Sequence, residues 1–423
     1  MLTEEPLRLV VVGQGYVGLP LAQEAVKAGL AVIGFEQNVD RVSDLNDGRS
    51  HVDDISDAEV RAMVDAGYRA SADPTDLAGA DAIVICVPTP LTVDGAPDLA
   101  AVRGAVETIG RNLTAGTLVV LESTTYPGTT EEVVLPILEG SGLRLDEDFF
   151  LAFSPERIDP GNPHFGLANT PKVVGGVSER SSDVAVDFYS RFVDTVVRAK
   201  GAKEAETAKL LENTYRHINI ALVNEMAKFC HDLGIDIWDV IDAASSKPFG
   251  FQAFRPGPGV GGHCIPIDPN YLSFEVKRRL GYPFRFVELA ESINASMPSY
   301  VVDRIAELLA HRETTLEGAS VLLLGVTYKA NIADQRESPA VDVAEELLRR
   351  GAELSFHDPH VERWFLGSGE RSRVESLDAA VSEADVVVLL QAHDEYDVDA
   401  LAGRARNFFD TRGVSRAPGA VRL

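Results

Sequence analysis

The chain has 423 residues, of which 45 % are hydrophobic and 25 % charged, so a sizeable core spread over roughly two to four domains is possible. The formal net charge of −26 argues against nucleic acid and anionic membrane surfaces as partners, because both are bound by clustered Lys and Arg. The sequence has no apolar stretch of transmembrane length, and its first residues, which include Glu4 and Glu5, do not form a signal-peptide pattern.

The N-terminal part of the chain predicts a parallel sheet with helices on both faces through about residue 200. Residues 7–12 form an apolar run that ends in a glycine-rich turn, and a helical pattern follows to about Ala28. Residues 31–35 form the second strand, which ends at Glu36. Three more apolar strands, separated by helical segments, are expected at residues 82–87, 118–121 and 150–153.

The middle of the chain is predicted to be helical. Residues 202–233 contain neither Pro nor Gly and predict one long helix. Helical patterns continue to about Ala310, interrupted by a glycine- and proline-rich loop at residues 248–269. A second α/β region follows, with strands at residues 321–324, 353–356 and 385–390. The expected fold class is therefore α/β, with two Rossmann-like doubly wound domains (residues 1–200 and 311–423) joined by a central helical domain (residues 201–310).

The pattern Gly13-x-Gly15-x-x-Gly18 predicts a dinucleotide site, because it follows a strand and opens a helix. The helix N-terminus offers N–H groups and a positive dipole end to phosphates. Glu36 ends the next strand, where an acid bonds the ribose hydroxyls and repels a 2′-phosphate, so NAD is favoured over NADP. Arg41 slightly weakens that preference, because a nearby Arg can hold a 2′-phosphate. A glycine turn without a ligand is the less favoured alternative.

Cys264 is the candidate nucleophile, because it follows Gly261-Gly262-His263 in a loop that lets a substrate approach the backbone closely. A thiolate can attack an aldehyde, and the thiohemiacetal that forms is a hydride donor. The alternative is a small buried hydrophobe, which suits Cys86 on a strand and Cys230 on the long helix. Three cysteines without a CxxC pair fit a reducing compartment, and we expect a cytoplasmic protein.

Two further groups can serve such chemistry. Lys209 and Asn213 lie four residues apart on one helix face and can stabilise an oxyanion, although a solvated face is the better explanation for this pair alone. Glu156 follows a strand end, where it is equally a general acid or base or a surface charge. Asp268 lies within reach of Cys264 if the segment turns into a helix.

No His/Cys/Asp cluster has metal-ligand spacing, so no metal is predicted.

Seven motifs in this order resemble the UDP-glucose/GDP-mannose dehydrogenase family over essentially the whole chain. They are Gly13–Gly18, Val87-Pro88-Thr89-Pro90, Glu122-Ser123-Thr124, Ser154-Pro155-Glu156-Arg157, Lys209-Leu210-Leu211-Glu212-Asn213, the segment from Gly261 to Asp268, and Tyr328-Lys329 through Arg336-Glu337-Ser338-Pro339.

The resemblance implies oxidation of a sugar C6 alcohol to a carboxylate in two hydride transfers that use two NAD+ per turnover. It implies that Cys264 traps the aldehyde and then carries a thioester, which water hydrolyses. Lys209 and Asn213 match the pair that stabilises the oxyanion, and Glu156 matches the acid that assists hydrolysis. Asp268 and Thr124 match positions that handle water and protons.

The resemblance also implies binding residues. The positions that match NAD contacts include the turn glycines Gly13, Gly15 and Gly18 together with Tyr16, Val17, Glu36, Arg41, Thr89, Thr124 and Arg336. The positions that match contacts to the nucleotide sugar are Arg157, Lys209, Asn213, Arg216, Gly261, Lys329 and Arg412. A central long helix that builds a homodimer, an N-terminal NAD domain and a C-terminal UDP-sugar domain follow from the same resemblance. The basic residues among these positions would gather positive charge around a diphosphate in an otherwise acidic protein.

The substrate expected within the family is UDP-N-acetylglucosamine. His263 and Ile267 differ from the residues usual in UDP-glucose dehydrogenases and are similar to the branch that acts on UDP-N-acetylhexosamines. Residues 247–251 resemble the UDP-N-acetylglucosamine enzymes, whereas Arg255 is less typical. UDP-N-acetylmannosamine, UDP-N-acetylgalactosamine and UDP-glucose remain alternatives.

Two other classes of protein compete with this interpretation. A one-step reductase or epimerase would rely on a Tyr-x-x-x-Lys pair after a Rossmann strand, which the sequence lacks, and would leave Cys264 unexplained. A non-catalytic NAD- or nucleotide-sugar-binding protein would have no reason to retain Lys209, Asn213, Cys264 and Asp268 together.

Overall fold

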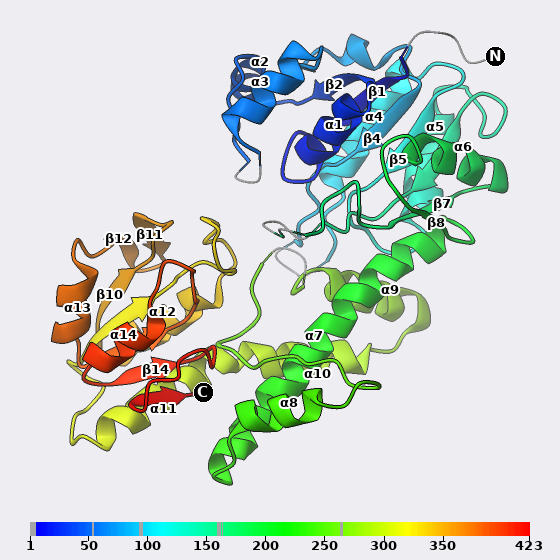
Figure 1. The fold of residues 1–423 in the computed structure, drawn as a ribbon. Coiled ribbons are helices and arrows are strands. Elements are labelled where there is room, and N and C mark those ends of the chain that lie inside the picture. The colour runs from blue at the N-terminus through cyan, green and yellow to red at the C-terminus, as the bar shows by residue number, and fades with distance from the viewer. Residues whose placement is uncertain (1–5, 53–54, 93–95, 159–161, 163, 263–264) are drawn as a thin grey trace. The chain divides into compact units, whose positions relative to one another are not determined.

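The computed structural model describes residues 6–52, 55–92, 96–158, 162, 164–262 and 265–423. The chain divides into two compact units, which are treated separately below. The first consists of Met1–Glu212 and Asn270–Tyr282, and the second of Asn213–Pro269 and Pro283–Leu423 (Figure 1). Among the helices of the described residues, none combines the length and the apolar character needed to span a bilayer.

The first unit is built on one sheet of eight strands in the order β3-β2-β1-β4-β5-β6-β7-β8. The strands are β1 (Arg8–Val12), β2 (Ala31–Phe35), β3 (Arg69–Ser71), β4 (Ala82–Ile85), β5 (Leu118–Leu121), β6 (Phe150–Phe153), β7 (Lys172–Gly176) and β8 (Val196–Arg198). The five strands expected from the sequence are confirmed. The expectation of a parallel sheet is wrong at one place, because β7 pairs with β6 in the antiparallel direction.

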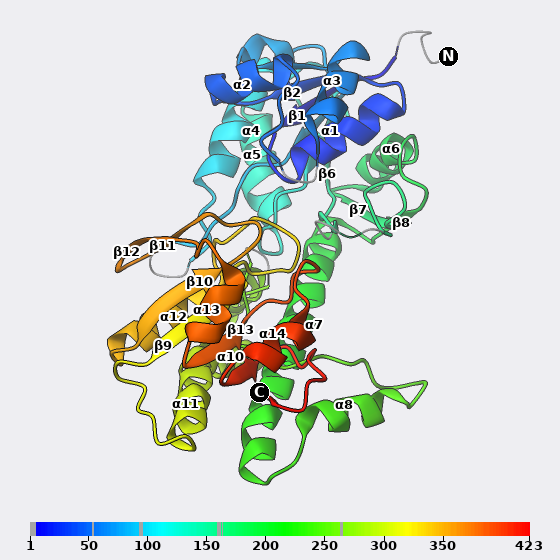
Figure 2. The same cartoon turned by 60° about the vertical axis from the view of Figure 1, so that its left-hand side comes forward.

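Helices cover both faces of this sheet, as expected (Figure 2). They are α1 (Gly18–Lys27), α2 (Val39–Asn46), α3 (Asp57–Asp65), η1 (Pro74–Leu77), α4 (Ala100–Asn112), η2 (Thr130–Val134), α5 (Leu135–Glu139) and α6 (Glu179–Tyr189). Alternation along the strands separates the two faces. Val11 packs with side chains of α1, α3 and α6, whereas its neighbour Val10 packs with side chains of α4 and α5.

The expected long helix is α7 (Ala202–Asp232), and the division between the two units falls inside it, between Glu212 and Asn213. It ends where Gly234 adopts a φ of +69° and the N–H of Ile235 bonds the carbonyl of Cys230, a left-handed cap that glycine allows. Four helices follow: α8 (Ile237–Ser245), α9 (Asp268–Leu280), α10 (Arg285–Ala295) and α11 (Met297–Ala310). The predicted loop therefore ends two residues early, because Asp268 is already the first residue of α9.

The second unit contains a parallel sheet of five strands in the order β10-β9-β13-β14-β15. The strands are β9 (Ser320–Leu324), β10 (Glu353–His357), β13 (Val386–Leu389), β14 (Phe408–Asp410) and β15 (Ala420–Arg422), and a separate hairpin joins β11 (Arg363–Leu366) to β12 (Gly369–Ser372). Helices α12 (Pro339–Arg349), α13 (Leu377–Glu383) and α14 (Val398–Arg404) complete the region. The side chains of α11 and α12 pack on one face of the sheet, and those of α13 and α14 pack on the other.

Candidate active site

The glycine turn after β1 has the geometry that a dinucleotide site needs. Gly13 has a φ of +90°, and a Cβ there would lie 2.5 Å from the carbonyl oxygen of Cys86. A Cβ on Gly18 would lie 1.9 Å from the carbonyl oxygen of Gly13, so the helix can pack this closely only with glycine. Gly15 has open space on its Cβ side, where a pyrophosphate can approach the backbone. The three glycines therefore fit the roles expected of them.

Gln14 anchors this turn from inside the first unit. Its amide donates to the carbonyl of Val11 at 2.8 Å and accepts the hydroxyl of Tyr68 at 2.8 Å. Glu36, at the end of β2, accepts the N–H of Gln14 at 3.2 Å and that of Asn38 at 3.0 Å. The Glu36 carboxylate is thus held beside the turn, where an acid can meet the ribose of a bound NAD. These residues fit the dinucleotide.

Five of the other positions predicted to contact NAD belong to the first unit, and the sixth belongs to the second. Tyr16 is 38 % exposed and Val17 is the residue before α1. Arg41 lies on α2, and Thr89 follows β4, where its carbonyl accepts the hydroxyl of Tyr271. Thr124 follows β5, and Arg336 belongs to the second unit, where it pairs with Asp334 at 2.8 Å. Contacts of all six with NAD stay predictions.

The first unit brings together Glu156 and Lys209, which are 53 residues apart in the sequence. The ammonium of Lys209 donates to the main-chain carbonyl of Glu156 at 2.6 Å. One carboxylate oxygen of Glu156, Oε1, accepts the N–H of Arg157 at 2.6 Å and that of Ile158. The side chain of Arg157 pairs with Glu212 at 2.9 Å. A cation and a fixed carboxylate therefore stand side by side at the carboxyl end of β6.

The sequence prediction missed three buried groups next to Glu156. Lys172 Nζ lies 3.0 Å from Glu122 Oε1 and 3.5 Å from Glu156 Oε2, and the hydroxyl of Tyr189 donates to Glu122. Burial raises the pKa of Glu122, and it raises the pKa of Tyr189 well above its usual value. Two of these residues left a signal in the sequence. Glu122 belongs to the motif Glu122-Ser123-Thr124, and Lys172 is a charged residue at the start of a short apolar run.

The second unit brings together Asn213 and Asp268. Asn213 Nδ2 donates to Asp268 Oδ2 at 2.5 Å, and both residues are buried, at 5 % and 3 % exposure. Asp268 is the first residue of α9, where a carboxylate is favoured by the helix dipole. Cys264, the predicted nucleophile, and His263 lie outside the described residues.

The residues predicted to bind the nucleotide sugar gather partly at one edge of the second sheet. A Cβ on Gly261 would lie 2.7 Å from the carbonyl of Glu337 and 2.9 Å from Cβ of Tyr328, the residue before Lys329. Arg412 follows β14, donates to the carbonyl of Leu390 at 2.6 Å and lies against Gly257. The structure thus places Gly261 against the segment that carries Lys329, and Arg412 against the same glycine-rich loop.

Charge is retained at this edge. Burial lowers the pKa of Arg412 to about 10, which still leaves the guanidinium charged at neutral pH. Arg216 is exposed on α7 in the second unit, and Arg157 belongs to the first unit. Their contacts with substrate stay predictions.

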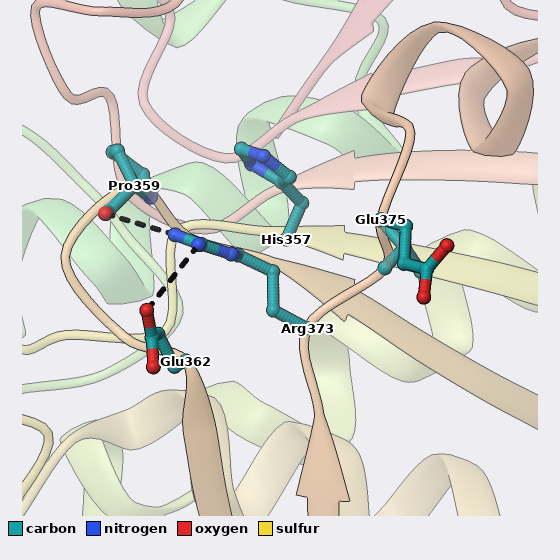
Figure 3. A pocket seen from close by; sticks show the side chains of 6 residues that line it. His357, Pro359, Glu362, Arg373 and Glu375 are labelled. Carbon is teal, nitrogen blue, oxygen red and sulfur yellow. Dashed lines mark hydrogen bonds and ion pairs between the residues drawn. The ribbon is translucent and has the colours of Figure 1, made fainter.

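A pocket of about 530 Å³ lies beyond the carboxyl end of β10 (Figure 3). It is lined by His357, Pro359, Glu362, Arg373, Val374 and Glu375. The guanidinium of Arg373 donates to the carbonyls of Asp358 and Pro359, each at 3.0 Å. No residue predicted for catalysis or substrate binding lines this pocket, and we assign it no ligand.

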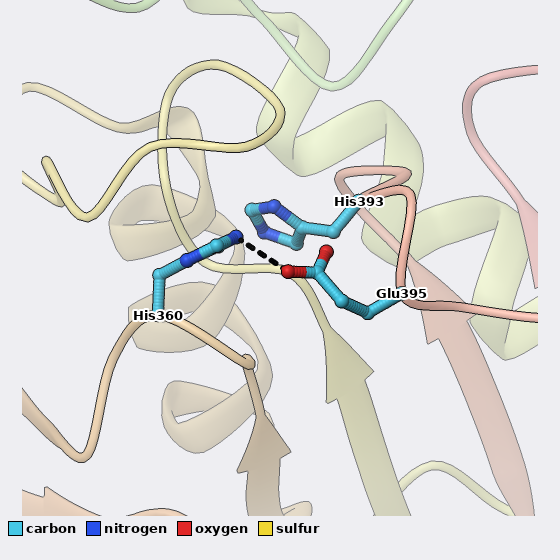
Figure 4. A group of neighbouring side chains, drawn as sticks. All are labelled: His360, His393 and Glu395. Carbon is cyan, nitrogen blue, oxygen red and sulfur yellow. Dashed lines mark ion pairs between the residues drawn. The ribbon is translucent and has the colours of Figure 1, made fainter. Parts of the chain in front are cut away.

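His360, His393 and Glu395 offer potential metal ligands within 4.8 Å of one another (Figure 4). Both ring nitrogens of His393 are engaged, however. Its Nδ1 accepts the N–H of Asn331 at 2.9 Å, and its Nε2 contacts Asp358 Oδ2 at 3.0 Å. With both nitrogens bonded, His393 connects the loops that follow β9, β10 and β13. The prediction that no metal is bound stays a prediction.

The glycine turn and the acid at the end of β2 give the first unit the geometry of a Rossmann-type dinucleotide-binding domain. The chain belongs to the UDP-glucose/GDP-mannose dehydrogenase family. The NAD-binding domain of that family matches residues 7–193, its central domain matches residues 203–296, and its UDP-binding domain matches residues 322–417. It is therefore a UDP-sugar dehydrogenase that uses NAD.

Several named relatives resemble the chain over most of its length. The UDP-N-acetyl-D-glucosamine 6-dehydrogenase of Pseudomonas aeruginosa is 38 % identical over 84 % of this chain and 83 % of its own. The UDP-N-acetyl-D-mannosamine dehydrogenase of Methanocaldococcus jannaschii is 35 % identical over 96 % and 92 %. The solved structure of the UDP-N-acetylmannosamine dehydrogenase of Pyrococcus horikoshii has a TM-score of 0.88 at 31 % identity and covers 98 % of both chains.

Proposed function

We propose that the protein oxidises the C6 alcohol of UDP-N-acetylglucosamine to the carboxylate in two steps, through a thiohemiacetal and a thioester on Cys264. The observation that carries this proposal is the hydrogen bond between Asn213 and Asp268. These two residues were singled out for separate catalytic roles and lie 55 positions apart, yet the fold joins them in a buried site. The contact of Lys209 with Glu156 adds independent support from the first unit.

The first half of the reaction makes the aldehyde and captures it. Bound NAD+ supplies the hydride acceptor in both oxidations. Cys264 sulfur then forms a bond to the aldehyde carbon, and the carbonyl oxygen gains negative charge before it is protonated. The ammonium of Lys209 and the amide of Asn213, four residues apart on α7, are donors suited to that oxygen.

The second half releases the product. After the second oxidation the acyl carbon is bound to sulfur, and a water oxygen attacks this carbon. Glu156 accepts a proton from that water, the carbon–sulfur bond breaks, and Cys264 leaves as a thiolate. Asp268 and Thr124 are proposed to hold water and pass protons. The described part of the site offers a carboxylate whose orientation is already fixed by the N–H groups of Arg157 and Ile158.

The choice of sugar rests on residues 247–251 and on the relatives. Lys247 Nζ lies 5.0 Å from the centre of the Phe249 ring, and Phe249 is 71 % exposed, so this segment presents side chains to solvent. It is available to meet a sugar substituent such as the N-acetyl group. UDP-N-acetylmannosamine is the second candidate, because relatives named for that substrate are 35 % and 33 % identical to the chain.

A panel of nucleotide sugars tests the function. NADH formation is followed by absorbance with UDP-N-acetylglucosamine, UDP-N-acetylmannosamine, UDP-N-acetylgalactosamine and UDP-glucose. We expect the highest kcat/KM with UDP-N-acetylglucosamine and two NADH for each sugar consumed. One NADH for each sugar would exclude the four-electron route, and a clear preference for the mannosamine compound would move the assignment to the second candidate.

We also propose three functional domains and a homodimer. The NAD domain would span residues 1–200, the central domain residues 201–310 and the UDP-sugar domain residues 311–423.

Helix α7 carries Tyr215, Leu222 and Phe229 at intervals of seven residues, with exposed fractions of 45 %, 53 % and 46 %. An apolar stripe with this period is typical of a helix that packs on another helix. A second copy of α7 is the proposed occupant, and a cytoplasmic location is proposed for the enzyme.

A further inference from the structure

A buried charge cluster stands behind Glu156 in the first unit. It exists because β7 runs antiparallel to β6, so the first residue of β7 lies at the edge where β5 and β6 end. That first residue is Lys172, and Glu122 directly follows β5. The side chains of Lys172 and Glu122 are 4 % and 0 % exposed, and their charged atoms are 3.0 Å apart. A buried ion pair of this kind needs further partners to offset its desolvation.

The partners are Tyr189 and Glu156. Tyr189, on α6, donates its hydroxyl to Glu122 and lies in the same buried layer. Glu156 Oε2 lies 3.5 Å from Lys172 Nζ, whereas Oε1 is held by backbone N–H groups. The carboxylate of Glu156 is thus fixed at one oxygen by the backbone and faces a buried ammonium with the other.

The titratable groups around Glu156 come from several neighbouring elements in the described part of the first unit. Glu122 comes from the end of β5, Lys172 from β7, Tyr189 from α6 and Cys86 from the end of β4. From α7, Lys209 approaches the main-chain carbonyl of Glu156, not its carboxylate. The guanidinium of Arg157 is turned to Glu212. Lys172 is therefore the cation that directly faces both carboxylates.

This arrangement keeps Lys172 charged. Burial alone lowers the pKa of Lys172, but the carboxylates of Glu122 and Glu156 outweigh it, so the pKa lies above the usual lysine value. One ammonium must serve two carboxylates, and each carboxylate competes for it. Removing the charge of Lys172 takes a cation away from Glu156, whereas removing the charge of Glu122 takes away the competitor for that cation. The two removals therefore act on Glu156 in opposite directions.

We propose that Lys172 is a positioning residue for Glu156, and that its ammonium, shared with Glu122, holds the Glu156 carboxylate in place for thioester hydrolysis. The inference rests on the proposed function, because it concerns the hydrolytic step of that reaction. No bond to Lys172 is made or broken. It acts only through the group that accepts the proton from water.

The test measures the decay of the acyl-enzyme as a function of pH. The enzyme is mixed with UDP-N-acetylglucosamine and NAD+, quenched in acid at intervals and weighed intact, so that the covalent acyl group on Cys264 is followed directly. In Lys172→Met the acid limb of the hydrolysis rate is expected to move up by about one pH unit, because Glu156 loses its cation. In Glu122→Gln the acid limb of the hydrolysis rate is expected to move to lower pH, because Lys172 then pairs with Glu156 alone.

Lys172→Arg is the matched control, because it keeps the charge, and its profile is expected to stay near that of the wild type. Glu122→Gln preserves the shape of the buried site, so it keeps the proposal testable if Lys172→Met does not fold. A general loss of structure would move both profiles in the same direction. The inference is overturned if Lys172→Met superimposes on an active wild type, or if both variants shift the same way. A wild type that forms no acyl-enzyme with any UDP-sugar would instead overturn the proposed function itself.

Discussion

Asn213 Nδ2 donates a hydrogen bond of 2.5 Å to Asp268 Oδ2, and thereby joins the middle of α7 to the first residue of α9. Both side chains are buried. The carboxylate fixes which way the amide of Asn213 points, since only the NH2 group can donate to it. An amide oriented in this way keeps a second N–H for another acceptor, which in the proposed reaction is the oxygen of the thiohemiacetal.

Asp268→Asn is therefore expected to lower kcat by about 100-fold with little change in KM, because an amide can accept at only one of its two ends, offers a donor at the other, and no longer holds Asn213 in a single orientation. Steady-state NADH formation measures both constants. Asp242→Asn is the control, because Asp242 pairs with Arg255 on an exposed surface and should leave kcat unchanged. An Asp268→Asn enzyme with wild-type kcat would show that the pair is structural.

Cys264→Ser is expected to abolish formation of the uronate, because a serine alkoxide does not form a thioester. The product is measured by chromatography of the nucleotide sugars after prolonged incubation with NAD+. Cys230→Ala is the comparison, since Cys230 is a buried residue on α7 and has no proposed part in the chemistry. Uronate production by Cys264→Ser at the wild-type rate would refute covalent catalysis at this position.

Glu36→Gln is expected to raise KM for NAD+ by about 10-fold and to weaken the discrimination against NADP+, because the negative charge that faces the ribose is lost. The amide still has one oxygen that can accept a hydrogen bond from the backbone N–H groups of Gln14 or Asn38. Asp40→Asn, at an exposed position on α2, removes a similar charge and should leave both constants near the wild-type values. An unchanged ratio of NAD+ to NADP+ activity in Glu36→Gln would contradict the assignment.

The stability of the second unit is expected to depend on pH through His217. It is 1 % exposed, and burial lowers its pKa from 6.5 to about 4. The unfolded chain binds the proton more tightly, so the contribution of His217 is complete above pH 6.5 and is lost as the pH falls towards 4. Relative to His217→Gln, the wild type should lose about 2–3 kcal/mol of unfolding free energy between about pH 7 and pH 4.5.

Urea unfolding followed by tryptophan fluorescence measures this effect, because Trp238 and Trp364, the two tryptophans of the chain, both lie in the second unit. His311→Gln, at an exposed position, is the matched variant and should follow the wild type at every pH. A constant difference between wild type and His217→Gln over this range would contradict the depressed pKa.

Leu222→Glu is expected to convert the proposed dimer to a monomer, because it places a charge in the centre of the exposed stripe of α7. Sedimentation velocity at several protein concentrations measures the change. Phe365→Glu alters a residue that is 61 % exposed on β11, away from that helix in the sequence, and should leave the association unchanged. A wild type that sediments as a monomer at all concentrations would refute the dimer.

Local patterns were enough to predict much of the fold and the cofactor turn. The apolar runs gave most of the longer strands but not β7 (Lys172–Gly176), which begins with a lysine and ends in two glycines. The absence of Pro and Gly gave α7, and the three glycines with Glu36 gave the dinucleotide turn. Strands of three residues, such as Arg69–Ser71 and Phe408–Asp410, carry too little pattern to be recognised. Their pairing depends on neighbouring strands that are distant in the sequence.

The sequence by itself determined the family, the cofactor and the set of candidate residues, because each motif is a short run whose chemistry depends on residue type and spacing. Only the tertiary structure decided that β7 runs antiparallel to β6. That direction places the ammonium of Lys172 between Glu122 and Glu156. A buried charge is tolerated only where partners from other elements meet it, and which elements meet is a property of the packed sheet and not of any local pattern.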